Sequence, residues 1–137
     1  MVSGQGFEGI IFHSDIYTPT EKDISDLESK TKPYIQKYIA YCKEHKTEKG
    51  CDSLRTNQYI FVLNNLSFYK RRYTVETDPE GEKVIRVEAI LVYPGDHTLD
   101  GCDWKTVEIR DGGEAVYGAV YYLTKKEIKG FCINSNG

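Results

Sequence analysis

The chain has 137 residues, of which 39% are hydrophobic and 12% aromatic, and its formal net charge is −3. This length suffices for one domain with a hydrophobic core and is too short for two, so we expect a single domain over residues 1–137. Positive and negative residues are mixed along the chain, which argues against nucleic acid as the main partner, because phosphate binders concentrate positive charge. No apolar run approaches the roughly 20 residues that a transmembrane helix needs.

The chain opens with residues 1–6, which are mostly small and polar and predict a disordered terminus. The stretch Phe7–Phe12 predicts a short strand, and Gly9 within it favours an edge position in a sheet. An apolar export signal is absent from this opening. An exported form of the chain would therefore have lost its signal. If the removed signal was that of a lipoprotein, the chain would be anchored to a membrane.

A long amphipathic helix is predicted from Thr18 to Lys46. Its apolar side recurs at three- and four-residue steps, at Ile24, Leu27, Thr31, Tyr34, Ile35, Tyr38, Tyr41 and Cys42. Thr18 suits the capping position, Pro19 the first helical position, and Glu21 the place three residues after the cap. Pro33 removes one intrahelical hydrogen bond. The apolar stripe continues in phase across this proline, so we expect a kink there or two abutting helices.

Beyond Lys46, a polar connector over residues 47–56 precedes a series of predicted strands. The strands are expected at Tyr59–Leu63, Leu66–Thr77, Lys83–Tyr93, Trp104–Arg110, Glu114–Leu123 and Ile128–Ile133. Asp78–Gly81 and Asp111–Gly113 carry the Pro and Gly residues of tight turns. Because no helix separates the strands, the pattern predicts an antiparallel meander of four to six strands.

The alternation of residues that face the two sides of a sheet is clearest in Lys83–Tyr93. There, a second set that includes Arg86 and Glu88 alternates with a set that is expected to face the helix: Ile85, Val87, Ala89, Leu91 and Tyr93. The fold class predicted is α+β, with one helix, kinked near Pro33, packed on a curved antiparallel sheet.

The order of strand, long helix and antiparallel meander is similar to the cystatin-like and NTF2-like architectures. Several short motifs also resemble an uncharacterised family of small bacterial exported proteins. They are Thr18-Pro19-Thr20, Tyr69-Lys70-Arg71-Arg72-Tyr73, Gly81-Glu82-Lys83-Val84-Ile85, Asp103-Trp104, Asp111-Gly112-Gly113 and Asn134. The resemblance implies export but brings no activity. The protease-binding hairpin and Pro-Trp loop of cystatins are absent, which disfavours inhibition of that type.

The four cysteines allow two disulfides, and Cys42–Cys51 with Cys102–Cys132 is one of three pairings. The first would join the end of the helix to the following loop. The second would join the loop before Trp104 to the last strand. Two disulfides would place the chain outside the reducing cytosol, whereas four free thiols would be compatible with the cytoplasm. No C-x-x-C pair is present, so we expect no zinc site.

The loop from Pro94 to Trp104 holds Asp96, Asp100, Asp103 and His97. The carboxylates are suitable ligands for Ca²⁺, but their spacing does not match an EF-hand, and the alternative is a solvated turn. His97 is a candidate general base with an orienting aspartate, or a partner of Cys102. Trp104 is a candidate contact residue. We expect no metal and no cofactor.

The segment Tyr69-Lys70-Arg71-Arg72-Tyr73 mixes cations with aromatic rings. Tyr69, Arg71, Arg72 and Tyr73 are therefore candidate contacts for an anionic ligand or an acidic protein surface. The alternative is an edge or outer strand that its charges protect against sheet-to-sheet pairing.

Motifs of hydrolases, zinc proteases and nucleotide-binding proteins are absent. The sequence therefore favours a non-enzymatic binding protein of the cell envelope, such as an inhibitor or immunity-type partner of another protein. The alternative is an NTF2-like pocket that binds or transforms a small molecule, since such enzymes often carry no sequence signature.

Overall fold

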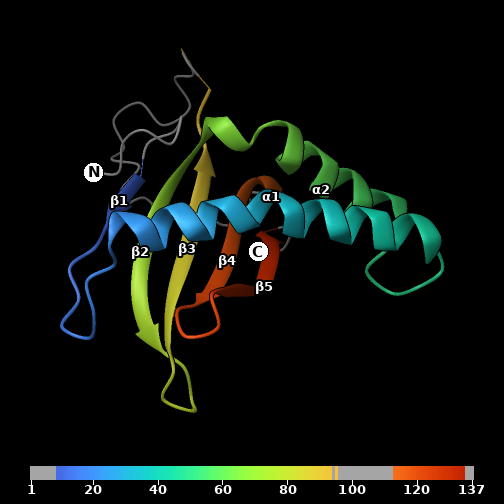
Figure 1. Ribbon diagram of the computed structural model, residues 1–137. Coiled ribbons are helices and arrows are strands. Elements are labelled where there is room, and N and C mark those ends of the chain that lie inside the picture. Colours follow the sequence, from blue (N-terminus) through green and yellow to red (C-terminus); the bar gives the residue numbers. More distant parts are fainter. Residues whose placement is uncertain (1–8, 94, 96–112, 135–137) are drawn as a thin grey trace.

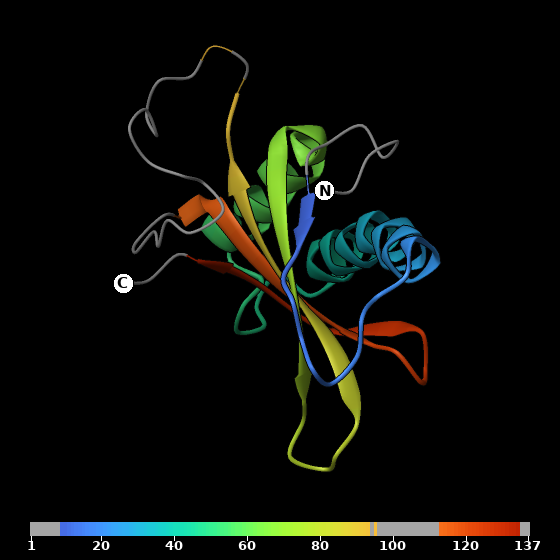
Figure 2. The ribbon, with the colours of Figure 1, turned by 90° about the vertical axis from the view of Figure 1, so that its left-hand side faces the viewer.

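The computed structural model describes residues 9–93, 95 and 113–134 of the chain. Its elements are β1 (Gly9–Ile11), α1 (Glu21–Glu44), α2 (Ser53–Asn64), the 3₁₀ helix η1 (Leu66–Phe68), β2 (Tyr69–Thr77), β3 (Lys83–Leu91), β4 (Gly113–Tyr122) and β5 (Glu127–Asn134). The strands form one mixed sheet in the order β1-β2-β3-β4-β5, and both helices pack against it (Figures 1 and 2). The predicted α+β class is confirmed.

Helix α1 confirms the long amphipathic helix but begins two residues later than expected. Thr20, not Thr18, is the capping residue: its hydroxyl accepts a hydrogen bond from the Asp23 backbone N–H, and the Asp23 carboxylate accepts one from the Thr20 N–H. This reciprocal pair satisfies two backbone donors at the helix end. Pro33 lies inside a single helix. Ser29 and Pro33 are both exposed, so the carbonyl that loses its intrahelical partner lies on the solvent side.

The structure corrects the prediction of a strand at Tyr59–Leu63, because this stretch lies in the second half of α2. Asp52 caps the helix, with its carboxylate accepting from the Arg55 backbone N–H at 2.8 Å. Tyr59 and Val62, three residues apart, are buried on one side of the helix. A short apolar run fits a strand or a buried helix equally well, and here it belongs to a helix that Asp52 caps.

The sheet confirms the antiparallel order of the later strands. β2 and β3 form a hairpin around the predicted turn at Asp78–Gly81, and β4 and β5 follow in sequence. The predicted strand Leu66–Thr77 begins with η1, so β2 starts at Tyr69. β1 pairs with β2 in the parallel direction, which corrects the expectation of an entirely antiparallel sheet. β1 does lie at one edge of the sheet, as Gly9 indicated.

The face of the sheet toward the helices carries the core. Residues in register across β2, β3 and β4, such as Val75, Ile85 and Tyr121, point to this face together. The expected helix-facing set is confirmed for Ile85, Val87 and Ala89, which are buried in the same core as α1, and for Leu91, which packs against it. Tyr93 lies beyond the end of β3 and is exposed, so the expectation is wrong for that residue.

Aromatic rings connect the elements through this core. Ring centroids lie 4.0 Å apart for Tyr38 and Tyr59, 5.5 Å for Tyr59 and Phe131, 5.1 Å for Phe131 and Tyr117, and 4.9 Å for Tyr117 and Tyr69. This continuous series runs from α1 through α2, β5 and β4 to β2. Stacked and edge-to-face pairs of this kind stabilise a core beyond the area they bury.

Several sequence predictions lie outside the described residues. They are the disordered terminus at residues 1–6, the strand at Trp104–Arg110, and the greater part of the turn at Asp111–Gly113. In the part of the chain that is described, neither helix is long and apolar enough to cross a lipid bilayer.

Candidate functional site

The predicted contact residues of β2 are buried. Tyr69, Arg71 and Tyr73 point toward the helices and are 0%, 3% and 0% exposed. Arg72 points to the opposite face, is 8% exposed, and forms an ion pair with Glu88 on the neighbouring strand. β2 also has a strand on each side, so it is not an edge. The structure therefore brings Tyr69, Arg71 and Tyr73 together between the sheet and the helices and leaves Arg72 on the other face, so the four residues do not form one exposed patch.

A polar cluster forms around Arg71 between α1 and the sheet. Arg71 Nη2 lies 3.4 Å from Glu28 Oε1, and Arg71 Nη1 donates to the Leu66 carbonyl at 2.8 Å. The Tyr73 hydroxyl donates to Glu28 Oε2 at 2.6 Å. Burial, together with the charge and hydrogen bond of Glu28, raises the pKa of Tyr73 well above its ordinary value. Glu28 thus balances the positive charge of Arg71 and accepts a hydrogen bond from the Tyr73 hydroxyl, and both of these groups are excluded from water by the core.

Sequence reasoning missed Glu28, although a signal for it exists. Glu28 lies four residues after Ile24 and one after Leu27, which places it within the apolar stripe of α1. A carboxylate within an apolar stripe indicates a buried partner of opposite charge.

Tyr117 closes the cluster from β4. Its ring is 1% exposed, and its hydroxyl has no hydrogen-bond partner among the described residues. Burial raises the pKa of Tyr117. The neutral phenol is therefore the form that the core holds.

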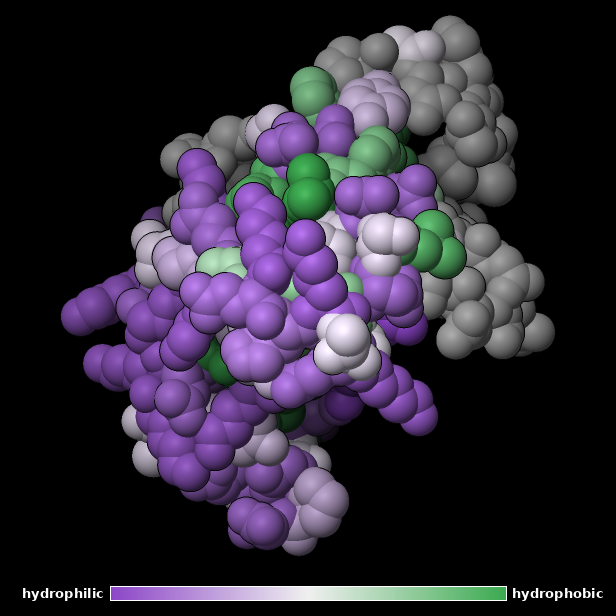
Figure 3. All heavy atoms as spheres, turned by 90° about the vertical axis from the view of Figure 1, so that its right-hand side faces the viewer, coloured by the Kyte–Doolittle hydropathy of each residue, from purple (hydrophilic) through white to green (hydrophobic). Residues whose placement is uncertain are grey.

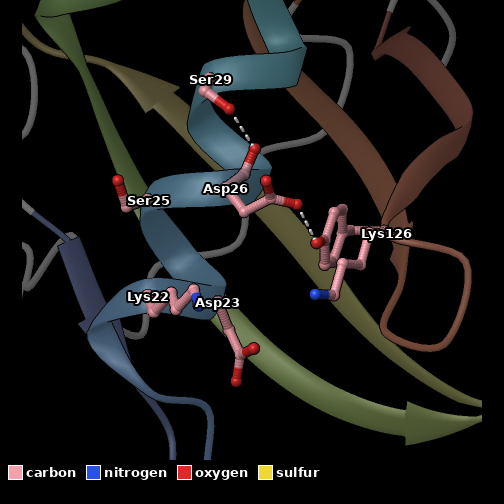
Figure 4. A pocket seen from close by; sticks show the side chains of 7 residues that line it. Lys22, Asp23, Ser25, Asp26, Ser29 and Lys126 are labelled. Carbon is pink, nitrogen blue, oxygen red and sulfur yellow. Dashed lines mark hydrogen bonds between the residues drawn. The ribbon is translucent and has the colours of Figure 1, made fainter.

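A second candidate site is an open hollow of about 300 Å³ beside the first half of α1. Figure 4 shows Asp26 pointing toward the sheet, where its carboxylate accepts from the Tyr121 hydroxyl. Lys30 Nζ donates to the same carboxylate at 2.9 Å. The bonds from Tyr121 and Lys30 lower the pKa of Asp26, so it stays ionised. Lys22 and Lys126 place two ammonium groups at the rim.

A third candidate is a groove of about 340 Å³ on the opposite face of the sheet. Arg86 Nε lies 2.9 Å from Glu76 Oε2, and Lys129 Nζ lies 4.9 Å from the centre of the Tyr122 ring. Both cations are therefore already engaged with neighbouring side chains. This groove offers a mixed surface, without a preference for one sign of ligand charge.

Cys42 and Cys51 form the predicted disulfide, which joins the end of α1 to the residue before the α2 cap. Cys132 on β5 is exposed and forms no disulfide with another described cysteine. Cys102 lies outside the described residues, as do Asp96, His97, Asp100, Asp103 and Trp104. The second predicted disulfide and the proposed roles of that loop remain predictions.

Metal-ligating side chains do not gather in groups of three or more over residues 9–93, 95 and 113–134. Comparison with protein-family models, curated proteins and solved structures finds no match to this chain.

Proposed function

We propose that this chain is a non-enzymatic binding domain of the cell envelope, which acts as an inhibitor or immunity-type partner of another protein. The observation that carries the proposal is the filled space between α1 and the sheet. Tyr59, Tyr69, Tyr73, Tyr117 and Tyr121 occupy it, each at most 4% exposed. A protein that transforms a small molecule in an NTF2-like manner needs an open chamber at this position, and these rings fill it.

The Cys42–Cys51 disulfide supports export. Disulfides form and persist in oxidising compartments and are rare in the cytosol. Both sulfur atoms belong to buried residues, Cys42 at 1% and Cys51 at 6% exposure, as expected of a structural crosslink. Recognition of another protein is the proposed activity of such an exported domain.

The test begins in the native host. A tagged chain is crosslinked in intact cells and purified from separated envelope and cytosolic fractions. We expect the chain in the envelope fraction with Cys42 and Cys51 blocked against thiol labelling, and with one protein recovered repeatedly. The purified partner should then bind the purified chain in calorimetry. A cytosolic chain with labelled Cys42 and Cys51 would contradict the envelope assignment.

The second candidate function is small-molecule binding in the hollow beside α1. The arrangement of Asp26, Tyr121, Lys22 and Lys126 favours it, because ionised groups of both signs face one concave surface. The two functions are distinguished by mass spectrometry of the small molecules that the freshly purified chain releases when it is denatured. Retention of a stoichiometric small molecule, lost in Asp26→Ala and recovered without any protein partner, would favour the second candidate.

A further inference from the structure

We propose that the corner at which α1 meets α2 is the docking surface of this protein, and that its occupant is an acidic protein surface. The corner comprises residues 37–55: the last turns of α1, the connecting loop and the first turn of α2. This inference depends on the proposed function, because it assigns the partner's chemistry and the surface that recognises it. Four features of the corner carry it.

The first feature is charge. Five basic and three acidic residues lie in the corner, a net charge of +2 within a chain whose net charge is −3. The four lysines of the corner are exposed, and none forms an ion pair within the part of the chain described; they are Lys37, Lys43, Lys46 and Lys49. Unpaired cations on one side of a molecule attract an acidic partner and raise its association rate.

The second feature is a pair of exposed apolar side chains. Leu54 is 71% exposed and Tyr41 is 45% exposed, and they are two of only four large hydrophobic residues exposed in the described ranges. Figure 3 views the side of the molecule that carries the corner, and it shows isolated hydrophobic side chains among predominantly hydrophilic ones. Apolar anchors within a charged rim are the usual composition of a protein–protein contact.

The third feature is that Tyr41 is already ordered. Its ring stacks on His45 with centroids 4.1 Å apart, and its hydroxyl donates to Glu48. A side chain held in one orientation loses little conformational entropy when a partner covers it. Tyr41 is therefore suited to act as a contact residue although it contributes little to the core.

The fourth feature is the rigidity of the corner itself. The Cys42–Cys51 disulfide holds the two Cα atoms 4.9 Å apart, and the Tyr38 hydroxyl on α1 donates to the Gly50 carbonyl in the connecting loop. Gly50 adopts φ of +90°, a conformation that other residues rarely adopt. These restraints fix the segment that carries Tyr41 relative to the one that carries Leu54.

An acidic protein fits this surface better than a uniformly anionic partner such as a lipid bilayer or a nucleic acid. Glu44, Glu48 and Asp52 lie among the lysines, and they would repel the continuous negative charge of an anionic bilayer or a nucleic acid. A protein surface can place its carboxylates opposite the lysines and leave these three positions uncharged. The mixture of positive and negative side chains in the corner therefore favours a protein partner whose negative charges are spaced to match the lysines.

The test uses site-specific photocrosslinking in the native host. p-Benzoylphenylalanine replaces Leu54 in one variant and Ile16, which is 44% exposed on the segment before α1, in the control. We expect a crosslink to one protein from position 54 and none from position 16. A crosslink from position 16 alone would overturn the corner while leaving the proposed function standing. Crosslinks from neither position, with no partner recovered by general crosslinking, would overturn both.

The charge assignment is tested with the crosslinked protein once it is purified. Lys37→Glu/Lys46→Glu should weaken its binding by about tenfold or more, chiefly through slower association that is less sensitive to salt. The control Lys83→Glu/Lys125→Glu makes the same change in net charge at exposed positions on other elements, and it should change binding less than about twofold. Equal effects of the two variants would overturn the assignment.

A vesicle-binding experiment distinguishes a protein partner from a lipid surface. The wild-type chain is sedimented with phosphatidylglycerol vesicles at physiological salt, and we expect it to stay in the supernatant. The proposal would be overturned by two results together: the wild-type chain sediments but the Lys37→Glu/Lys46→Glu variant does not, and position 54 gives no protein crosslink. The occupant of the corner would then be an anionic bilayer.

Discussion

Arg71 and Glu28 form an ion pair inside the domain, with Arg71 Nη2 3.4 Å from Glu28 Oε1 and the two side chains 3% and 8% exposed. The pair joins β2 to α1 across the helix–sheet interface. Two charges in such a position are costly to remove from water, and each depends on the other. The Tyr73 hydroxyl, which donates to the same carboxylate, extends this dependence to a third side chain.

We therefore expect Glu28→Ala to lower the free energy of unfolding by about 3–5 kcal/mol, because it removes the Glu28 carboxylate from beside the buried Arg71 guanidinium. Urea denaturation followed by circular dichroism measures the change. Glu44→Ala makes the same substitution at an exposed position of α1 and should stay within about 0.5 kcal/mol of wild type. Similar losses in both variants would contradict a buried pair. If Glu28→Ala does not fold, Glu28→Gln offers the milder comparison.

The start of α1 gives a second prediction. Thr20→Ala removes the hydroxyl that accepts from the Asp23 N–H, and should cost about 1 kcal/mol of stability. Thr18→Ala removes the same group two residues earlier, outside the helix, and should be close to neutral. Thermal unfolding of the two variants measures the difference. A larger loss for Thr18→Ala would restore the helix start that the sequence alone indicated.

The disulfide gives a third prediction. Cys42 and Cys51 are nine residues apart, and a crosslink over a loop of this length stabilises by about 2–3 kcal/mol in the chain-entropy description. Cys42→Ala/Cys51→Ala should lose this amount, and dithiothreitol should lower the stability of wild type similarly without affecting the double variant.

The control for the disulfide is Cys132→Ala. Cys132 is exposed and forms no disulfide with a described cysteine, so its replacement should leave stability unchanged. A loss of stability in this variant would instead support the second predicted disulfide, Cys102–Cys132. Mass spectrometry before and after reduction should show the gain of two protons that belongs to Cys42 and Cys51. Full alkylation of Cys42 without reductant would contradict the bond.

Alkaline pH gives a fourth prediction. Burial raises the pKa of Tyr59 from 10.0 to about 12. A raised pKa means that the folded state favours the protonated phenol, so the stabilisation is complete below about pH 10 and is lost as pH rises toward 12. The stability difference between wild type and Tyr59→Phe should therefore decrease between these values. A difference that stays constant with pH would show that Tyr59 ionises as easily in the folded chain as in the unfolded one.

The sequence by itself determined the features that depend on near neighbours along the chain. The spacing of Ile24, Leu27 and Ile35 specifies an amphipathic helix whatever it packs on. The turn at Asp78–Gly81 and the alternation in β3 are equally local, and both agree with the structure. The pairing of Cys42 with Cys51 was one of the options that the sequence left open.

Tertiary structure decided the features that depend on distant partners. The run Tyr59–Leu63 suits a strand or a helix, and packing of Tyr59 on Tyr38 and Phe131 accompanies the helix. The short strand β1 gains its direction only by pairing with β2, about 60 residues later. Arg71 looks like a surface cation in the sequence, and it is buried because α1 brings Glu28 to it. Burial depends on what the rest of the chain places against a side chain, and periodicity along one element does not contain that information.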